Sequence, residues 1–392
     1  MKLELDTKSF VEAVSWVSKA FDPKDESAHI ALIVDADGNG LLSLSSKLSY
    51  SKTSVVVNTI ELEDGEEEVK LALSAGFLKR FAASLRSYDA PLTFSKDLAD
   101  VRTSLTVTRP GEKYTLPIVE AKVAAQPKSE VIGNVLDAEF FDALLKLSKL
   151  TDSANAGAMP AIGSVDVFFD NEDEEVTLLA TDRYAFGEIV LPFTPKEGAK
   201  FFDVEEISHL LLPAASAAAI SPSKGSSDSV EILFDEKNHR LGYSFSDGRI
   251  VLFALTASAQ PIAYKQLKEF ASATSASVLV SFPELKNVIS SISALAYDED
   301  SVSLSFSKSG LKVSDLKGAN SLNVVAEDVE GLDEELKAVF LRSVLLEALS
   351  PINTNRIRIN WTSEEKPFVF DPVGDDGEPL DNVFLMAVPK RA

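Results

Sequence analysis

The tripeptide Ala125-Gln126-Pro127 recurs as Ala259-Gln260-Pro261, a shift of 134 residues, and 131 residues then remain in the 392-residue chain. Self-similarity at a fixed spacing indicates an internal repeat. Proline biases the preceding residue towards an extended conformation, and the sequences around both tripeptides lack helical periodicity. We therefore interpret both stretches as linkers, which divide the chain into three domains: residues 1–124, 128–256 and 262–392.

Two amphipathic helices are predicted in each domain. The first lies near the domain's start, where apolar residues recur at helical spacing, as in Phe10, Val14 and Val17. The last helix is stopped by Pro351, since proline cannot continue a helix. The six predicted helical segments are residues 8–20, 75–88, 138–150, 204–218, 283–296 and 341–351.

Between the helices the apolar period falls to two, as in residues 41–45, 176–180 and 302–306, which predicts antiparallel strands. The stretch 35–40 begins like a calcium-binding loop, but its twelfth position is Ser46, where a bidentate glutamate is needed. We interpret it as a hairpin turn, and residues 170–175 as another. The fold class is therefore α+β.

Composition excludes several kinds of chemistry. Cysteine is absent, and histidine occurs only as His29, His209 and His239. Disulfides, thiol nucleophiles and cysteine-ligated zinc are thus excluded, and no nucleophile elbow, zinc-protease or nucleotide-binding motif is present. We expect no catalytic residues, no metal and no cofactor. With no long apolar run and no signal-peptide core at the N-terminus, we expect a cytoplasmic protein with no membrane segment.

The net charge of −23 would repel phosphate backbones from most of the surface. The six predicted helical segments nevertheless carry nine Lys or Arg against seven acidic residues. An even share of the net charge would be about −5. Two interpretations remain open: a basic inner surface beneath an acidic exterior, or ordinary solvated helix faces.

Four segments spread along the chain carry motifs of a known family. Met159–Val165 is similar to an R-P-V-L-x-G-V strand, and Leu178–Phe186 to an A-T-D-x-x-R-L segment. Phe340–Leu349 is similar to F-N-P-x-Y-L-L-D-A-L, and Phe384–Pro389 to a terminal L-L-M-P-V-R. In this order, the motifs resemble those of the bacterial sliding clamps, the β subunits of DNA polymerase III.

This resemblance implies a homodimer of three-domain protomers, closed into a ring with sheets outside and helices lining the hole. Double-stranded DNA would thread the hole without base readout, and the ring would tether a polymerase as a processivity factor. DNA polymerase and clamp loader would bind through short peptide motifs. Tyr114 and Leu116 resemble the family's dimer-interface strand. The expected DNA-facing residues are Lys19, Lys79, Arg80, Arg86, Lys146, Lys149, Lys286 and Arg342.

The resemblance also implies an apolar groove for partner peptides. Its matching positions are Thr181, Tyr184, Phe186, Pro261, Leu267, Val344, Met386 and Val388. The sequence departs from the family here, because Ala185 replaces an arginine and Val344 a tyrosine. We therefore expect weak binding of a generic clamp-binding peptide. Two other functions remain open: a repeat-built scaffold without DNA threading, and a three-domain carbohydrate or peptide enzyme with acidic catalytic residues.

Overall fold

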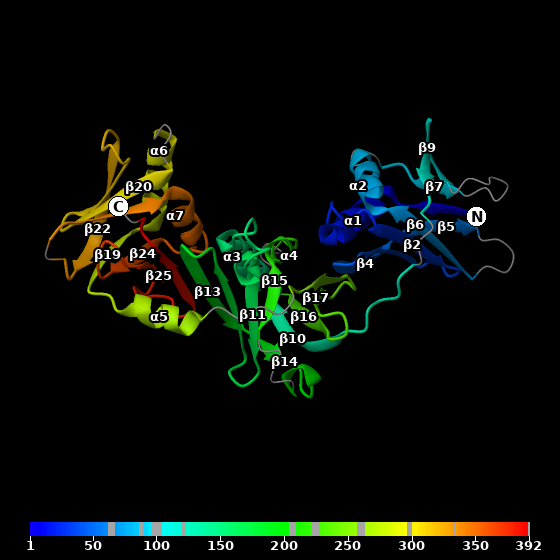
Figure 1. Cartoon of the computed structure of the whole chain (residues 1–392). Helices are drawn as coiled ribbons and strands as arrows, with labels where there is room; N and C mark the ends of the chain where they lie inside the picture. The colour runs from blue at the N-terminus through cyan, green and yellow to red at the C-terminus, as the bar shows by residue number, and fades with distance from the viewer. Residues whose placement is uncertain are drawn as a thin grey trace. The chain divides into compact units, whose positions relative to one another are not determined.

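The chain forms two compact units in the computed structural model (Figure 1). Unit 1 comprises residues 1–137, 194–207 and 225–255, and unit 2 comprises residues 138–193, 208–224 and 256–392. The structure describes residues 1–61, 67–85, 89–95, 104–119, 123–203, 209–221, 228–256, 263–295, 300–332 and 334–390.

The order of elements repeats three times along the chain: a strand, a helix, a run of four or five strands, a second helix and three strands. The first repeat contains β1 (Lys2–Leu5), α1 (Thr7–Val17), β2 (His29–Asp35), β3 (Gly40–Ser45), β4 (Ser49–Val55), β5 (Val57–Glu61), β6 (Glu68–Ser74), α2 (Ala75–Ser84), β7 (Leu92–Ser95), β8 (Ser104–Arg109) and β9 (Glu112–Pro117). The second contains β10 (Glu130–Leu136), α3 (Asp137–Leu147), β11 (Ser164–Asp170), β12 (Glu175–Thr181), β13 (Ala185–Pro192), β14 (Thr194–Pro195), β15 (Leu210–Pro213), α4 (Ala214–Ala217), β16 (Ser229–Asp235), β17 (Arg240–Ser244) and β18 (Ile250–Ala254).

The third repeat is preceded by an additional helix, α5 (Tyr264–Ser272). It contains β19 (Ala276–Ser281), α6 (Phe282–Leu295), β20 (Ser301–Ser307), β21 (Gly310–Ser314), β22 (Ser321–Glu330), β23 (Leu336–Leu341), α7 (Arg342–Ala348), β24 (Arg356–Trp361), β25 (Phe368–Val373) and β26 (Val383–Ala387). The repeated order confirms the predicted α+β fold of repeated domains, whereas the exact domain boundaries stay a prediction.

Within the described residues, unit 1 holds a five-stranded sheet, β5-β1-β7-β8-β9, and a nine-stranded sheet, β14-β10-β16-β17-β18-β4-β3-β2-β6. Unit 2 holds a twelve-stranded sheet in the order β15-β11-β12-β13-β26-β25-β24-β19-β22-β21-β20-β23. Strand pairs β4–β18 and β13–β26 are both antiparallel, and each joins strands from consecutive repeats. Each nine- or twelve-stranded sheet is therefore continuous across a repeat boundary.

Aromatic side chains of helices and strands pack together inside each unit. In unit 1, Phe10 of α1 meets Phe94 of β7, with ring centroids 5.4 Å apart. Asp6 caps α1 by accepting a hydrogen bond from the backbone N–H of Ser9 (2.7 Å), as expected for an N-cap aspartate. In unit 2, Phe306 of β20 lies 4.4 Å from Trp361 of β24 between ring centroids. These aromatic contacts form part of each unit's buried core.

Both predicted hairpin turns are confirmed. Residues 35–40 connect β2 to β3, and the Asp35 carboxylate accepts hydrogen bonds from the backbone and side-chain nitrogens of Asn39 (2.8 and 2.9 Å). Gly38 adopts a φ of 84°, a conformation that favours glycine. Residues 170–175 likewise connect β11 to β12. The structure contains no calcium-ligand cluster among the described residues.

The predicted helix over residues 204–218 is wrong in its central part. Leu210 and Leu211 lie in strand β15, which pairs with β11, and the α4 helix that follows spans only Ala214–Ala217. The run Leu210–Leu212 is buried on both faces, and periodicity cannot distinguish such a strand from a buried helix segment. Residues 204–208 lie outside the described part of the chain.

Candidate functional site

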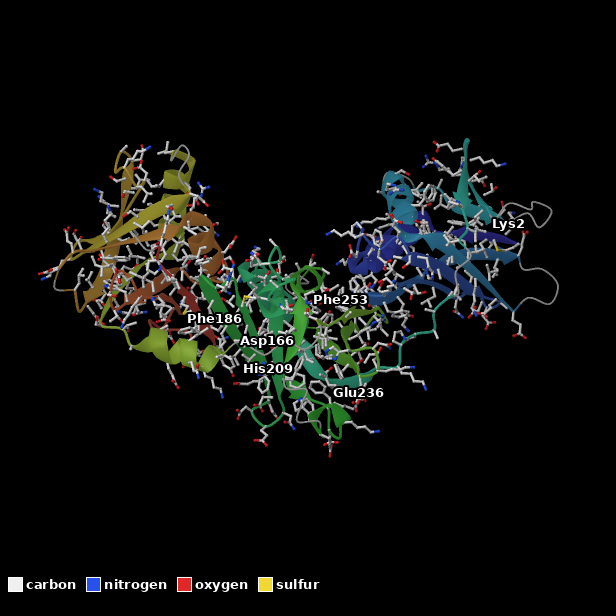
Figure 2. All side chains as sticks on the ribbon, viewed as in Figure 1. Lys2, Asp166, Phe186, His209, Glu236 and Phe253 are labelled. Carbon is white, nitrogen blue, oxygen red and sulfur yellow. The ribbon has the colours of Figure 1, made fainter. Side chains whose placement is uncertain are left out.

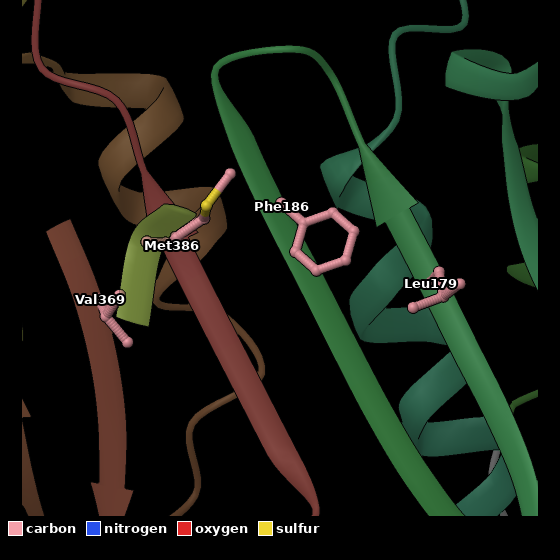
Figure 3. Close-up of a cluster of buried hydrophobic side chains, with 5 residues drawn as sticks. Leu179, Phe186, Val369 and Met386 are labelled. Carbon is pink, nitrogen blue, oxygen red and sulfur yellow. The ribbon is translucent and has the colours of Figure 1, made fainter. Parts of the chain in front are cut away.

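A closed apolar cluster in unit 2 contains three of the residues assigned to the partner groove. Phe186 of β13 lies between Leu179 of β12 and Met386 of β26 (Figure 3), and Phe186 and Met386 are paired directly across the two strands. Val369 and Ala271 complete the buried set, against which Tyr264, Leu267 and Phe384 pack. We call these eight residues the apolar cluster. The structure therefore brings Phe186, Leu267 and Met386 together.

The turn between β12 and β13 is held in place by its own side chains. The Thr181 hydroxyl donates to the Ala185 carbonyl (2.5 Å) and accepts from the Arg183 N–H (3.0 Å). The Asp182 carboxylate accepts from the backbone N–H groups of Tyr184 (2.8 Å) and Ala185 (2.6 Å). This bonding keeps Arg183 at a φ of 83° and leaves the Tyr184 side chain 50% exposed at the tip.

Other residues assigned to the groove border this turn. The Val388 N–H donates to the Tyr184 carbonyl (2.7 Å), which extends the β13–β26 ladder past Met386. Val344 is buried on α7, a helix that contacts β13 and β26. Burial and the charge of Asp182 raise the pKa of Glu347, also on α7. Pro261 lies outside the described residues.

Two buried carboxylates lie in one row across the same face of the sheet. Asp166, Leu179, Glu188 and Phe384 are direct neighbours on β11, β12, β13 and β26. Asp166 is fully buried and accepts from His209, whose Nδ1 lies 3.0 and 3.1 Å from its two carboxylate oxygens (Figure 2). His209 lies just before β15 and not on the helix predicted over residues 204–218.

Glu188 is the second buried carboxylate of this row. Its Oε1 forms an ion pair with Lys268 of α5, while its Oε2 has no hydrogen-bond partner among the described residues. Lys268 also lies over the Phe384 ring, 5.4 Å from its centroid. Burial raises the pKa of Tyr264, and the charges of Glu188 and Asp166 raise it further. The first two turns of α5 therefore cover the carboxylate row.

Basic side chains in unit 1 gather around α1. Lys19 lies over the Trp16 ring at 4.9 Å from the centroid, and Arg249 lies over the same ring at 4.2 Å. Burial lowers the pKa of Lys19, and the neighbouring charge of Arg249 lowers it further. These three residues and Lys8 line a hollow of about 670 Å³. Arg249 precedes β18 outside the helical segments, so the charge count along helices missed it.

The other basic residues occupy helix surfaces. Lys79 and Arg80 of α2 are exposed and lie over Phe21 and Phe77 respectively. In unit 2, Lys146 pairs with Asp142 (2.7 Å), Arg342 lies 3.6 Å from Asp300, and Lys149 and Lys286 are exposed. Arg86 lies outside the described residues. Local acids thus partly neutralise Lys146 and Arg342, and Lys79, Arg80, Lys149 and Lys286 retain exposed charge.

The expected interface residues lie on a sheet edge. Strand β9 carries Tyr114 and Leu116 and pairs with β8 alone among the described strands. Leu116 is buried, and Tyr114 packs on Phe81 with ring centroids 5.2 Å apart while its hydroxyl donates to Glu112. The side chains therefore face their own unit, whereas the backbone edge is open to another strand.

Comparison with solved structures places this arrangement among known folds. The DNA polymerase sliding clamp of Bacillus subtilis superposes with a TM-score of 0.79 at 16% identity, covering 100% of this chain and 99% of that one. The Helicobacter pylori β clamp bound to a DNA ligase peptide gives 0.77 at 16% identity, with full coverage of both chains. The chain has the fold of the bacterial β sliding clamps.

The sequence comparison agrees with this fold. The β sliding clamp of Streptomyces coelicolor is 23% identical over 382 residues, which cover 94% of this chain and 93% of that clamp. No family model matches the chain. The resemblance read from scattered motifs is thus confirmed, and the low identity indicates a diverged sequence on the sliding-clamp fold. None of the described helices is long and apolar enough to span a membrane.

Proposed function

We propose that the protein is a DNA sliding clamp, a processivity factor that encircles duplex DNA and tethers the replicative polymerase. The observation that carries this proposal is the match to sliding clamps along the whole chain, which includes each of the three repeats. The proposed clamp has no catalytic residues and works in the cytoplasm. Its ring would be a head-to-tail homodimer of three-domain protomers, with domain boundaries near residues 124–128 and 256–262.

The strand pairs inside each unit suggest how two copies join. In β4–β18 and β13–β26, a middle strand of one repeat pairs antiparallel with the last strand of the next. By the same rule β9, the last strand of the first repeat, would pair with β22, the corresponding middle strand of the third. The first half of β22 pairs with β21 alone among the described strands, and it exposes Leu322 and Val325.

This proposed contact uses edges that are open in a single chain. An exposed strand edge invites addition of another strand, and a head-to-tail contact between identical chains can close into a ring. The contact occurs twice in a two-fold dimer. Light scattering at micromolar concentration should give twice the chain mass of 42.3 kDa. A monomer at that concentration would count against the ring.

DNA would be held by topology, because the net charge of −23 opposes simple adhesion. Lys19, Arg249 and Lys8 around the α1 hollow, with the exposed basic residues of α2, offer a small number of phosphate contacts. Such contacts weaken steeply with salt and read no sequence, so they permit sliding.

The decisive experiment compares DNA before and after cutting. Protein loaded on nicked circular DNA should remain bound at a salt concentration that removes it from linear duplex. It should leave when the circle is linearised. Equal retention on both forms would overturn the proposal, and negative-stain class averages without a duplex-sized hole would do so independently.

Partner peptides would bind at the edge formed by the β12–β13 turn and the apolar cluster. An extended peptide with a Leu-Phe-like pair would contact exposed Tyr184 and place its apolar pair over Phe186 and Met386. The adaptable side chain of Met386 suits a site that accepts several partners. We expect affinity in the micromolar range or weaker, about 8 kcal/mol or less of binding free energy.

A further inference from the structure

Helix α5 fills the space above the groove residues. Tyr264, Leu267 and Ala271 recur at i, i+3 and i+7, so they form one apolar stripe along the helix. All three belong to the apolar cluster, and Ala271 is part of its buried set. Beneath this stripe Phe186 is fully buried and Met386 is 6% exposed. These two residues therefore offer almost no exposed apolar surface to the side chains of a peptide.

One ion pair connects α5 to the sheet beneath it. Lys268 lies one residue after Leu267 and pairs with Glu188 of β13, whose side chain is 6% exposed. The other nearby buried carboxylate, Asp166, has its own partner in His209. The Lys268 side chain is 37% exposed, so it can reach water more easily than Glu188 can.

The C-terminal end of α5 is held separately. The Thr362 hydroxyl donates to the Ala273 carbonyl, and the Ser275 N–H donates to the Trp361 carbonyl (3.0 Å), both beside β24. These bonds fix the chain just after the helix. A movement of the helix away from the strands would therefore leave its C-terminal attachment in place.

We propose that α5 is a built-in occupant of the partner site, latched by the Lys268–Glu188 ion pair, and that partner peptides bind only when it is displaced. This inference rests on the proposed function for the identity of the site, although the latch itself does not depend on it. The apolar side chains of the peptide would replace Leu267 and Ala271 over Phe186 and Met386. The apparent affinity is then the intrinsic affinity reduced by the fraction of molecules in which α5 is open.

The variant Lys268→Met tests the latch. It removes the positive charge while keeping the length of the side chain, and it leaves the Glu188 carboxylate buried without a counter-charge. An unpaired buried charge is strongly unfavourable, so the chain should relieve it by lifting α5 and admitting water. Hydrogen exchange of the α5 amides, measured without any peptide, should accelerate by about tenfold or more.

Two further variants test whether faster exchange comes from losing the ion pair or only from removing a lysine charge from α5. Lys265→Met makes the same change at an exposed position of the same helix and should leave the exchange of α5 amides unchanged. The double variant Glu188→Leu with Lys268→Met replaces the pair with apolar side chains next to Leu179 and Phe384, which is often neutral or stabilising. It should return the exchange of α5 amides to the wild-type rate or below.

Peptide binding then tests the coupling. In fluorescence anisotropy with a labelled peptide carrying a Leu-Phe pair, Lys268→Met should bind about tenfold more tightly than wild type. The double variant should bind no more tightly than wild type. Unchanged exchange in Lys268→Met would overturn the latch, and faster exchange without tighter binding would overturn the occupancy of the site. DNA retention on nicked circles is measured in parallel and reports on the proposed clamp function alone.

Discussion

Asp371 of β25 should make the stability of unit 2 depend on pH. Burial raises the pKa of Asp371 to about 6 from its ordinary value of 3.8, although the Asn360 side chain and the charge of Arg358 oppose the rise. Asn360 donates a hydrogen bond to the Asp371 carboxylate (2.7 Å). The buried surroundings of the Asp371 carboxyl group therefore favour its neutral form.

The direction of the effect follows from proton linkage. The folded chain binds the Asp371 proton more tightly than the unfolded chain, so the free energy of unfolding falls as pH rises from about 4 to about 6. A difference of about two pKa units corresponds to about 3 kcal/mol at most, and the partial exposure of Asp371 reduces it. About 1 kcal/mol of this loss should occur between pH 5 and pH 8.

Asp371→Asn removes the charge and keeps an acceptor for Asn360. The free energy of unfolding of the variant, relative to that of wild type, should therefore rise by about 1 kcal/mol between pH 5 and pH 8. Urea unfolding can follow unit 2 through Trp361, since Trp16 is the only other tryptophan in the sequence and can be replaced by phenylalanine. The matched control is Asp381→Asn, which removes an exposed carboxylate.

A stability difference between wild type and Asp371→Asn that does not change with pH over this range would contradict the raised pKa of Asp371. The same gain in Asp381→Asn would also contradict it, because the effect would then reflect net charge and not burial.

Three other predictions test the proposed surfaces. Val325→Lys, on the open half of β22, should shift the light-scattering mass from dimer towards monomer, whereas Leu48→Lys, at another exposed apolar position, should not. Lys79→Glu should lower the amount of protein retained on nicked circular DNA severalfold with no change in dimer mass, and an unchanged amount would remove α2 from the DNA-facing surface. Phe186→Ala should destabilise unit 2 by about 3 to 5 kcal/mol in urea unfolding because Phe186 is fully buried. Tyr184→Ala, at a half-exposed site, should weaken peptide binding without this decrease in the free energy of unfolding. Equal stability of the two variants would contradict the burial of Phe186.

Sequence reasoning predicted much of the architecture because the repeat and its periodicities are local properties of the chain. Residues 8–20, 138–150 and 283–296 do contain helices, since each carries an apolar stripe at helical spacing. It failed at residues 210–212, where a run of leucines is buried on both faces and has no period to detect. It also missed α5, which lies between the predicted linker and the first helix predicted in the third domain, because the two helices expected in each domain were assigned elsewhere.

Only part of the candidate site could be predicted from the sequence. The A-T-D-like segment located Thr181, Tyr184 and Phe186, and the structure brings Phe186 together with Leu267 and Met386. Sequence could not show that the cluster is closed, because closure depends on α5 packing against strands from two different repeats. Nor could it single out Glu188 among many acidic residues, since its burial is set by pairing across β12, β13 and β26.

The sequence by itself determined the repeat, the α+β class, the absence of cysteine chemistry and the acidic charge, because composition and local spacing carry each of these properties. The tertiary structure alone decided which strand edges stay open, which cations lie near Trp16 and which carboxylates are buried. Those properties arise from contacts between residues far apart in the chain, such as Lys268 with Glu188 and Arg249 with Trp16. Their energies depend on burial, which a linear pattern does not record.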